Sequence, residues 1–151
     1  MTNETILKYY ASTEHFRLTN PNPRAATKKG WHWDAPDCCI RALANAVGCD
    51  WLTAYDFLSA NARRDYTIPN DGVRFRDWLK AGGAVWTNCP AVKGKKRLTA
   101  LQFAEQHPTG RYIITIANHE IACVDGVMLD TCNFGSSAVV GYLEMSNYKI
   151  A

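Results

Sequence analysis

The sequence lacks the features typical of a membrane protein, a secreted protein or a nucleic-acid-binding protein. No apolar run approaches the ~20 residues that a membrane-spanning helix requires. The opening residues, MTNETILKYY, hold neither the basic start nor the apolar segment of a secretion signal. The formal net charge is only +3, too small to indicate a nucleic-acid partner. We therefore expect a cytoplasmic protein, of the producing cell or its host, that binds neither nucleic acid nor membranes.

The cysteines lack the spacing of a zinc site or a disulfide framework. The six of them are Cys38, Cys39, Cys49, Cys89, Cys123 and Cys132. No two form a C-x-x-C pair, and the intervals do not match a secreted disulfide pattern. In a reducing cytoplasm we expect free thiols. The sequence predicts no metal ion and no cofactor.

Length and composition predict one domain. A chain of 151 residues fits one domain better than two and can bury a core without metal or disulfide. Its 47% hydrophobic and 21% charged residues are ordinary for a soluble globular protein, which we expect to be a monomer. The longest basic run, KGKKR at 93–97, is interpreted as a solvated loop, with a patch for an acidic partner as the alternative.

The order of predicted elements indicates an α+β fold. Residues 1–33, rich in turn formers, are interpreted as an irregular N-terminal segment. Residues 34–110 are predicted to be mainly helical, and residues 111–151 mainly β. The predicted helices lie at 38–47, 51–63, 73–83 and within 98–110; three strands lie within 111–134 and a fourth within 137–145. We expect the helical half to pack against an antiparallel sheet.

Helical spacing predicts which side chains of two helices face the core. In the second helix, the apolar face holds Trp51, Leu52, Tyr55 and Leu58, with Ala54 and Phe57 beside them. In the third, it holds Val73, Phe75, Trp78 and Leu79.

Two adjacent cysteines stand where the first predicted helix begins, in the stretch DAPDCCIRALANA at 34–46. A thiolate there lies near unpaired backbone N–H groups and the positive end of the helix dipole, which lowers the thiol pKa. Cys39 continues the apolar stripe of the helix and is predicted to be core. Cys38 lies at the edge of that stripe and is predicted to face a groove. A purely structural role for Cys38 is the alternative.

The pair Asp125-Gly126 predicts that a histidine and an acid lie side by side. If this pair is a two-residue hairpin loop, the strands before and after it align outward from the turn. His119 and Asp130 then become diagonal neighbours on one face. An acid in an apolar strand costs free energy without a partner, and an imidazole is such a partner. The carboxylate would orient the imidazole and stabilise its charged form. A structural pair, or an Asp130 facing water, is the alternative.

The motif DCCIRALANA, followed far downstream by GRYIITIANHEIACVDGVMLDT, resembles the papain-like cysteine peptidase superfamily. The likeness is to small bacterial and phage-encoded members, whose nucleophile opens a helix as DC-x-x-RAL, and it covers residues 34–135. The family order of Cys, His, then Asn or Asp is matched by Cys38, His119 and Asp130. The resemblance implies a papain-like fold and a thiol protease with a catalytic triad that cleaves a peptide or isopeptide bond. Cys38 would attack the carbonyl, His119 would act as base and then acid, and Asp130 would orient His119.

The chain departs from that family in the donor for the oxyanion. The family commonly carries a glutamine shortly before the cysteine, whereas the glutamines here are Gln102 and Gln106. The backbone N–H of Cys38 could supply one donor, and His32 or the indole N–H of Trp33 or Trp31 another.

Several alternatives share these residues. Asn133 is a rival to Asp130 as the orienting residue. An amine acceptor in place of water would make a transglutaminase-like acyl transferase. A catalytically silent papain-like module that binds another protein is a different class. A metal site that includes Cys38 and His119 is the alternative with the weakest spacing.

Overall fold

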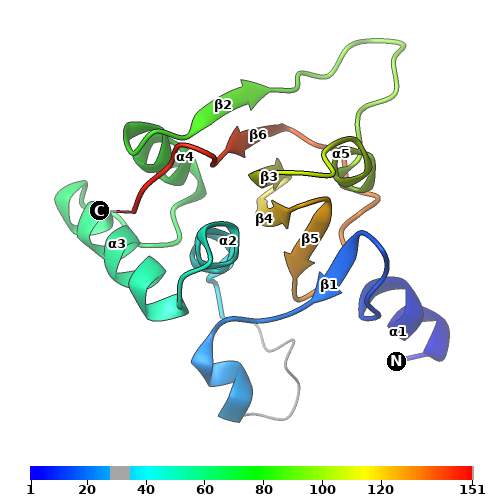
Figure 1. Cartoon of the computed structure of the whole chain (residues 1–151), viewed down its shortest axis with the longest axis horizontal. Coiled ribbons are helices and arrows are strands. Elements are labelled where there is room, and N and C mark those ends of the chain that lie inside the picture. Colours follow the sequence, from blue (N-terminus) through cyan, green and yellow to red (C-terminus); the bar gives the residue numbers. More distant parts are fainter. Residues whose placement is uncertain (28–34, 151) are drawn as a thin grey trace.

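The computed structural model describes residues 1–27 and 35–150, which build one mixed sheet flanked by helices (Figure 1). The α-helices of this part of the chain are α1 (Asn3–Tyr9), α2 (Cys38–Val47), α3 (Trp51–Arg64), α4 (Gly72–Ala81) and α5 (Ala100–Gln106). The strands are β1 (Phe16–Leu18), β2 (Val85–Asn88), β3 (Arg111–Ile116), β4 (His119–Val124), β5 (Val127–Asp130) and β6 (Gly141–Glu144). The predicted α+β class is confirmed. None of the described helices has the length and apolar character to cross a membrane.

The sheet differs from the predicted antiparallel one, because its order is β1-β5-β4-β3-β6-β2 and β1 runs parallel to β5. Two of its strands, β1 and β2, come from before residue 111. The prediction of an irregular segment at 1–33 is also wrong for the described residues 1–27, which hold α1, β1 and a 3₁₀ helix at Pro23–Thr27. These elements escaped prediction because α1 buries no residue and β1 is only three residues long, so neither shows an apolar period.

Helices flank the sheet (Figure 1), and an apolar cluster packs on each of its faces. On one face, α2, α3 and α4 pack over inward residues such as Ile113 of β3 and Ala122 of β4. On the other face, α5 packs through Phe103 against Ile114 and Met128. Neighbouring residues of β3 therefore serve opposite clusters, as the alternation of a strand requires. The helix α2 lies across β3, β4 and β5, which brings its first turn to the site described below.

The predicted inward faces of α3 and α4 are partly correct. Leu58, Phe75, Trp78 and Leu79 are buried, whereas Val73 is 82% exposed and Leu52 and Tyr55 are exposed. In α3 the buried residues are Ala54, Leu58 and Ala62. Leu58 and the neighbouring Ala54 belong to the predicted apolar face, whereas Ala62 was not predicted, because a pattern built on large apolar residues does not reveal it.

The hairpin between β4 and β5 has the predicted register. Asp125 and Gly126 have φ of 49° and 76°, as a two-residue loop of the primed type requires. Val124 pairs with Val127, Cys123 with Met128, and Ala122 with Leu129. A side chain at position 126 would meet the carbonyl oxygen of Ala104 at 3.2 Å, and its φ is unfavourable for L-residues. The turn therefore sets which face of the sheet each residue of β4 and β5 occupies.

Candidate active site

The helix α2 begins at Cys38 and ends before Gly48, as its sequence predicts. Gly48 adopts φ 75°, the left-handed conformation that commonly closes a helix. Cys39 is fully buried, whereas Cys38 is half-buried at the edge of the cluster. Asp37 occupies the N-cap position but makes no capping hydrogen bond with its side chain. The first-turn N–H groups of α2 therefore do not bind that carboxylate.

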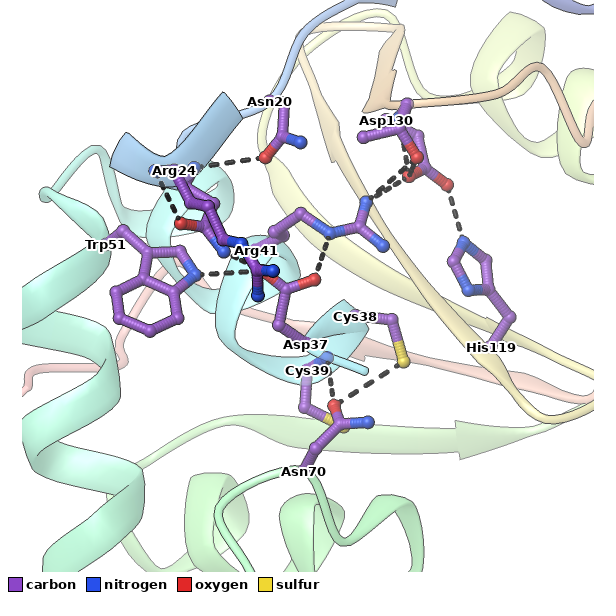
Figure 2. Close-up of polar contacts among 12 residues, drawn as sticks. Asn20, Arg24, Asp37, Cys38, Cys39, Arg41, Trp51, Asn70, His119 and Asp130 are labelled. Carbon is purple, nitrogen blue, oxygen red and sulfur yellow. Dashed lines mark hydrogen bonds and ion pairs between the residues drawn. The ribbon is translucent and has the colours of Figure 1, made fainter. Parts of the chain in front are cut away.

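His119 and Asp130 form the predicted pair at the end of the β4–β5 hairpin. His119 Nε2 lies 2.6 Å from Asp130 Oδ2. Asp130 is only 3% exposed, so the contact is shielded from water. The other ring nitrogen, Nδ1, lies on the side of Cys38 (Figure 2). The imidazole is therefore held between the carboxylate and the thiol.

Cys38 and His119 shift one another's pKa values. A hydrogen bond with Cys39 lowers the pKa of Cys38, burial raises it, and the hydrogen bond and charge of His119 lower it, to about 4. Burial lowers the pKa of His119, but hydrogen bonds and charge interactions with Asp130 and Cys38 raise it to about 9. Between these values the pair is a thiolate beside an imidazolium, the state in which a cysteine is nucleophilic and a histidine can donate a proton.

Arg41 anchors the carboxylate of Asp130, a role that sequence analysis missed (Figure 2). Its Nη1 donates to Asp130 Oδ1 at 2.7 Å, and the backbone N–H of Thr131 donates to the same oxygen at 2.7 Å. These bonds occupy Oδ1 and leave Oδ2 for His119. Arg41 is itself 6% exposed. An arginine inside the apolar stretch IRALA was the available signal, because such a residue is rarely buried without a partner.

Asp37 completes a buried charge network with Arg41. Arg41 Nε donates to Asp37 Oδ1 at 2.8 Å, within one turn of α2. The other oxygen, Oδ2, accepts from Trp51 Nε1 at 3.0 Å and from Asn22 Nδ2 at 2.8 Å. This explains why Asp37 does not cap α2 with its side chain. The network ties the start of α2 to the end of β5, and so fixes Cys38 relative to His119.

Two hollows meet at the thiol. One, of about 620 Å³, is lined by Tyr10, Arg41 and Phe134 among others. The second, of about 450 Å³, is lined by Arg76, Thr115 and Glu120 among others. Cys38, Asn70, Asn118 and His119 line both. An extended substrate has room to lie from one hollow to the other across the sulfur.

Glu120 is a buried acid in the second hollow, and sequence analysis did not single it out. It is 7% exposed, and Thr115 Oγ1 donates to its Oε2 at 2.7 Å. Burial raises the pKa of Glu120 to about 8. Near neutral pH this side chain is therefore mostly uncharged, and the second hollow offers a neutral acid beside the thiol.

The remaining predicted site residues have different outcomes. His32 and Trp33, like Trp31, lie outside the described residues. Asn133 Oδ1 accepts the backbone N–H of Gly135 at 2.9 Å in a local turn, and Asp130 is the residue bound to His119. Within residues 1–27 and 35–150 no group of three or more His, Cys, Asp or Glu side chains is arranged to hold a metal ion.

The arrangement unites a low-pKa thiol, a proton carrier and a fixed carboxylate beside open space. These are the groups required for nucleophilic attack on a carbonyl carbon followed by protonation of the leaving group. No family model, curated protein or solved structure matches the chain.

Proposed function

We propose that this protein is a papain-like cysteine hydrolase that cleaves a peptide or isopeptide bond through Cys38, His119 and Asp130. One observation carries the proposal: His119 bonds through Nε2 to Asp130 at 2.6 Å, while the other nitrogen of the same ring lies on the side of Cys38, which begins α2 (Figure 2). The open hollows on both sides of the sulfur support a substrate that extends in two directions.

The proposed reaction uses the ion pair in two steps. The Cys38 thiolate adds to the carbonyl carbon, and the imidazolium of His119 gives its proton to the departing amine, which leaves a thioester. His119, now neutral, takes a proton from water as the water attacks the thioester, and the released thiolate and imidazolium restore the starting state. Asp130 keeps the ring oriented and stabilises its positive charge throughout.

Alkylation by iodoacetamide at pH 5 tests the activated thiol. At that pH a thiol of pKa about 4 is nearly all thiolate, whereas one at 9.0 is about 10⁻⁴ thiolate. The low-pKa thiolate is intrinsically slower, by about 100- to 300-fold for a Brønsted coefficient of about 0.4–0.5. The net rate advantage of Cys38 over an ordinary thiol is therefore about 30- to 90-fold at pH 5, read by mass spectrometry of each cysteine.

The variant His119→Ala separates activation from mere exposure. Without the imidazolium, the pKa of Cys38 rises above about 4, although Cys39 still lowers it, so its labelling rate should increase with pH between pH 5 and 8. The wild-type rate should be nearly flat over that range. His107→Ala is the matched control, since His107 bonds Phe103 O and lines neither hollow. Equal labelling of all six cysteines in the wild type at pH 5 would refute the proposal.

The acyl-transferase alternative uses the same thioester and differs only in its acceptor. Adding a primary amine to the acylated protein should leave the acyl group mainly on water if the protein is a hydrolase. Predominant amide formation, detected by mass, would favour the transferase. A protein that never acylates would favour the silent binding module.

A further inference from the structure

We propose that Asn70 is a further catalytic residue, whose side-chain N–H donates to the oxygen that becomes negative when Cys38 attacks a carbonyl group. The inference rests on the proposed hydrolase function. Asn70 would then be the side-chain donor of the oxyanion site. It lies after Cys38 in the chain, in the turn between α3 and α4.

The orientation of the Asn70 amide is fixed by a neighbour that can only donate. Asn70 Oδ1 accepts the backbone N–H of Cys39 at 2.9 Å and, when Cys38 is a protonated thiol, its S–H, with Sγ 3.6 Å away. A backbone N–H requires an acceptor, so the atom facing it is the oxygen and the other is the nitrogen. In Figure 2 the nitrogen points away from the helix, on the sulfur side of the oxygen.

The nitrogen of Asn70 is available to a substrate. Asn70 lines both hollows that meet at the sulfur. In the described part of the chain, its Nδ2 makes no hydrogen bond, whereas Oδ1 is engaged. The backbone N–H of Cys38 is the first of α2 and has no acceptor within the helix. Two donors at the thiol site therefore have no hydrogen-bond partner in the described part of the chain, one from a side chain and one from the backbone.

These two donors match the charge that the reaction creates. When Sγ forms a bond to the carbonyl carbon, the π electron pair of the C=O moves to the oxygen, which becomes an anion. Donors at about 2.7–3.1 Å from that oxygen stabilise the anion more than the neutral carbonyl. The pair then returns to re-form C=O as the bond to the leaving group breaks. A hydrogen bond from Asn70 would lower the barrier of both events.

Asn118 is the rival amide, because it also lines both hollows. It sits in the turn between β3 and β4 with φ 54°, next to His119. No hydrogen bond orients its side chain in the described part of the chain, whereas that of Asn70 is pinned through Oδ1. A donor acts best when its direction is set before the reaction, which favours Asn70.

The test compares two reactions of the same thiol, of which only one forms an oxyanion. Acylation by p-nitrophenyl acetate passes through a tetrahedral anion, and the burst of p-nitrophenolate measures it. Alkylation by iodoacetamide is a displacement at an sp³ carbon and forms none. The variants are Asn70→Ala, and Asn70→Asp, which keeps an acceptor for the Cys39 N–H but has no donor. Alkylation is measured across pH, so that a change in the thiol pKa is separated from the limiting rate.

We expect both variants to lower the limiting acylation rate at least tenfold, and up to about 10³-fold, while the limiting alkylation rate changes less than threefold. Asn118→Gly, which suits the positive φ, tests the rival. Equal changes in both reactions, no change in acylation, or a loss with Asn118→Gly but not with Asn70→Ala would each overturn the role of Asn70. A wild type that shows neither a burst nor selective alkylation would instead remove the proposed function itself, and the role of Asn70 with it.

Discussion

Replacing Arg41 by methionine is expected to lower the free energy of unfolding by about 3 kcal/mol. The guanidinium bonds Asp37 Oδ1 at 2.8 Å and Asp130 Oδ1 at 2.7 Å. Both carboxylates are almost fully buried, at 4% and 3% exposed. Methionine fills much of the same space but leaves the two acids without their counter-charge.

The size of the expected loss of stability depends on the hydrogen bonds that each carboxylate retains in the variant. Removing one partner of a buried ion pair costs about 3–5 kcal/mol, because the other charge stays buried. Asp37 retains the Trp51 and Asn22 donors, and Asp130 retains His119 and the Thr131 N–H. These remaining bonds place the expected cost at the lower end of the range. For a chain of this size, 3 kcal/mol corresponds to a fall in Tm of about 6–12 °C.

Urea denaturation followed by tryptophan fluorescence measures the change, with Arg64→Met as the matched control. Arg64 pairs with Asp65 at 3.2 Å but is 65% exposed, and exposed pairs contribute little to stability. A loss below 1 kcal/mol for Arg41→Met, or equal losses for the two variants, would refute the reasoning that the buried network holds α2 to β5.

Two further predictions concern titration in the site. Asp130→Asn removes the carboxylate that raises the pKa of His119, so that pKa should fall from about 9 by at least one unit, towards 6.5; an NMR titration of the ring proton measures it, and a value still near 9 contradicts the prediction. Glu120 has a folded pKa of about 8 against an ordinary 4.5, so its contribution to stability is complete below about pH 4.5 and is lost as the pH rises through 8. The variant Glu120→Gln does not titrate, so its free energy of unfolding should rise relative to that of the wild type between pH 4.5 and pH 8, by about 4 kcal/mol at most. Urea unfolding of both proteins at pH 4.5 and at pH 8 measures this. The same difference between variant and wild type at the two pH values would contradict the prediction.

Local signals predicted the parts of the site that depend on short stretches of chain. The end of α2 follows from Gly48, and the register of β4 with β5 follows from Asp125-Gly126. The start of α2 was also predicted at Cys38, although the Asp37 side chain does not cap it. The contact between His119 and Asp130 is a consequence of that register, since it joins residues in one hairpin. Because a two-residue turn permits few alignments, this geometry needed no knowledge of the rest of the fold.

The contacts that were missed join segments distant in sequence. Asn70 reaches Cys39 from a turn 31 positions away, and Arg41 reaches Asp130 across 89. The pairing of β1 with β5 likewise joins the two ends of the chain. Hydrophobic periodicity in the sequence does not predict such contacts, because each depends on how distant helices and strands pack together. A buried arginine within an apolar stretch marks the need for a partner but does not identify it.

His119 and Asp130 lie 11 positions apart in one hairpin, whereas Arg41 precedes its partner Asp130 by 89 positions. On the ribosome, Cys38 therefore emerges long before the groups that activate it. Until α2 docks on β4, its thiol has the reactivity of any cysteine in an unfolded chain. The reactivity of this one sulfur therefore reports that β4 and β5 are in place against α2.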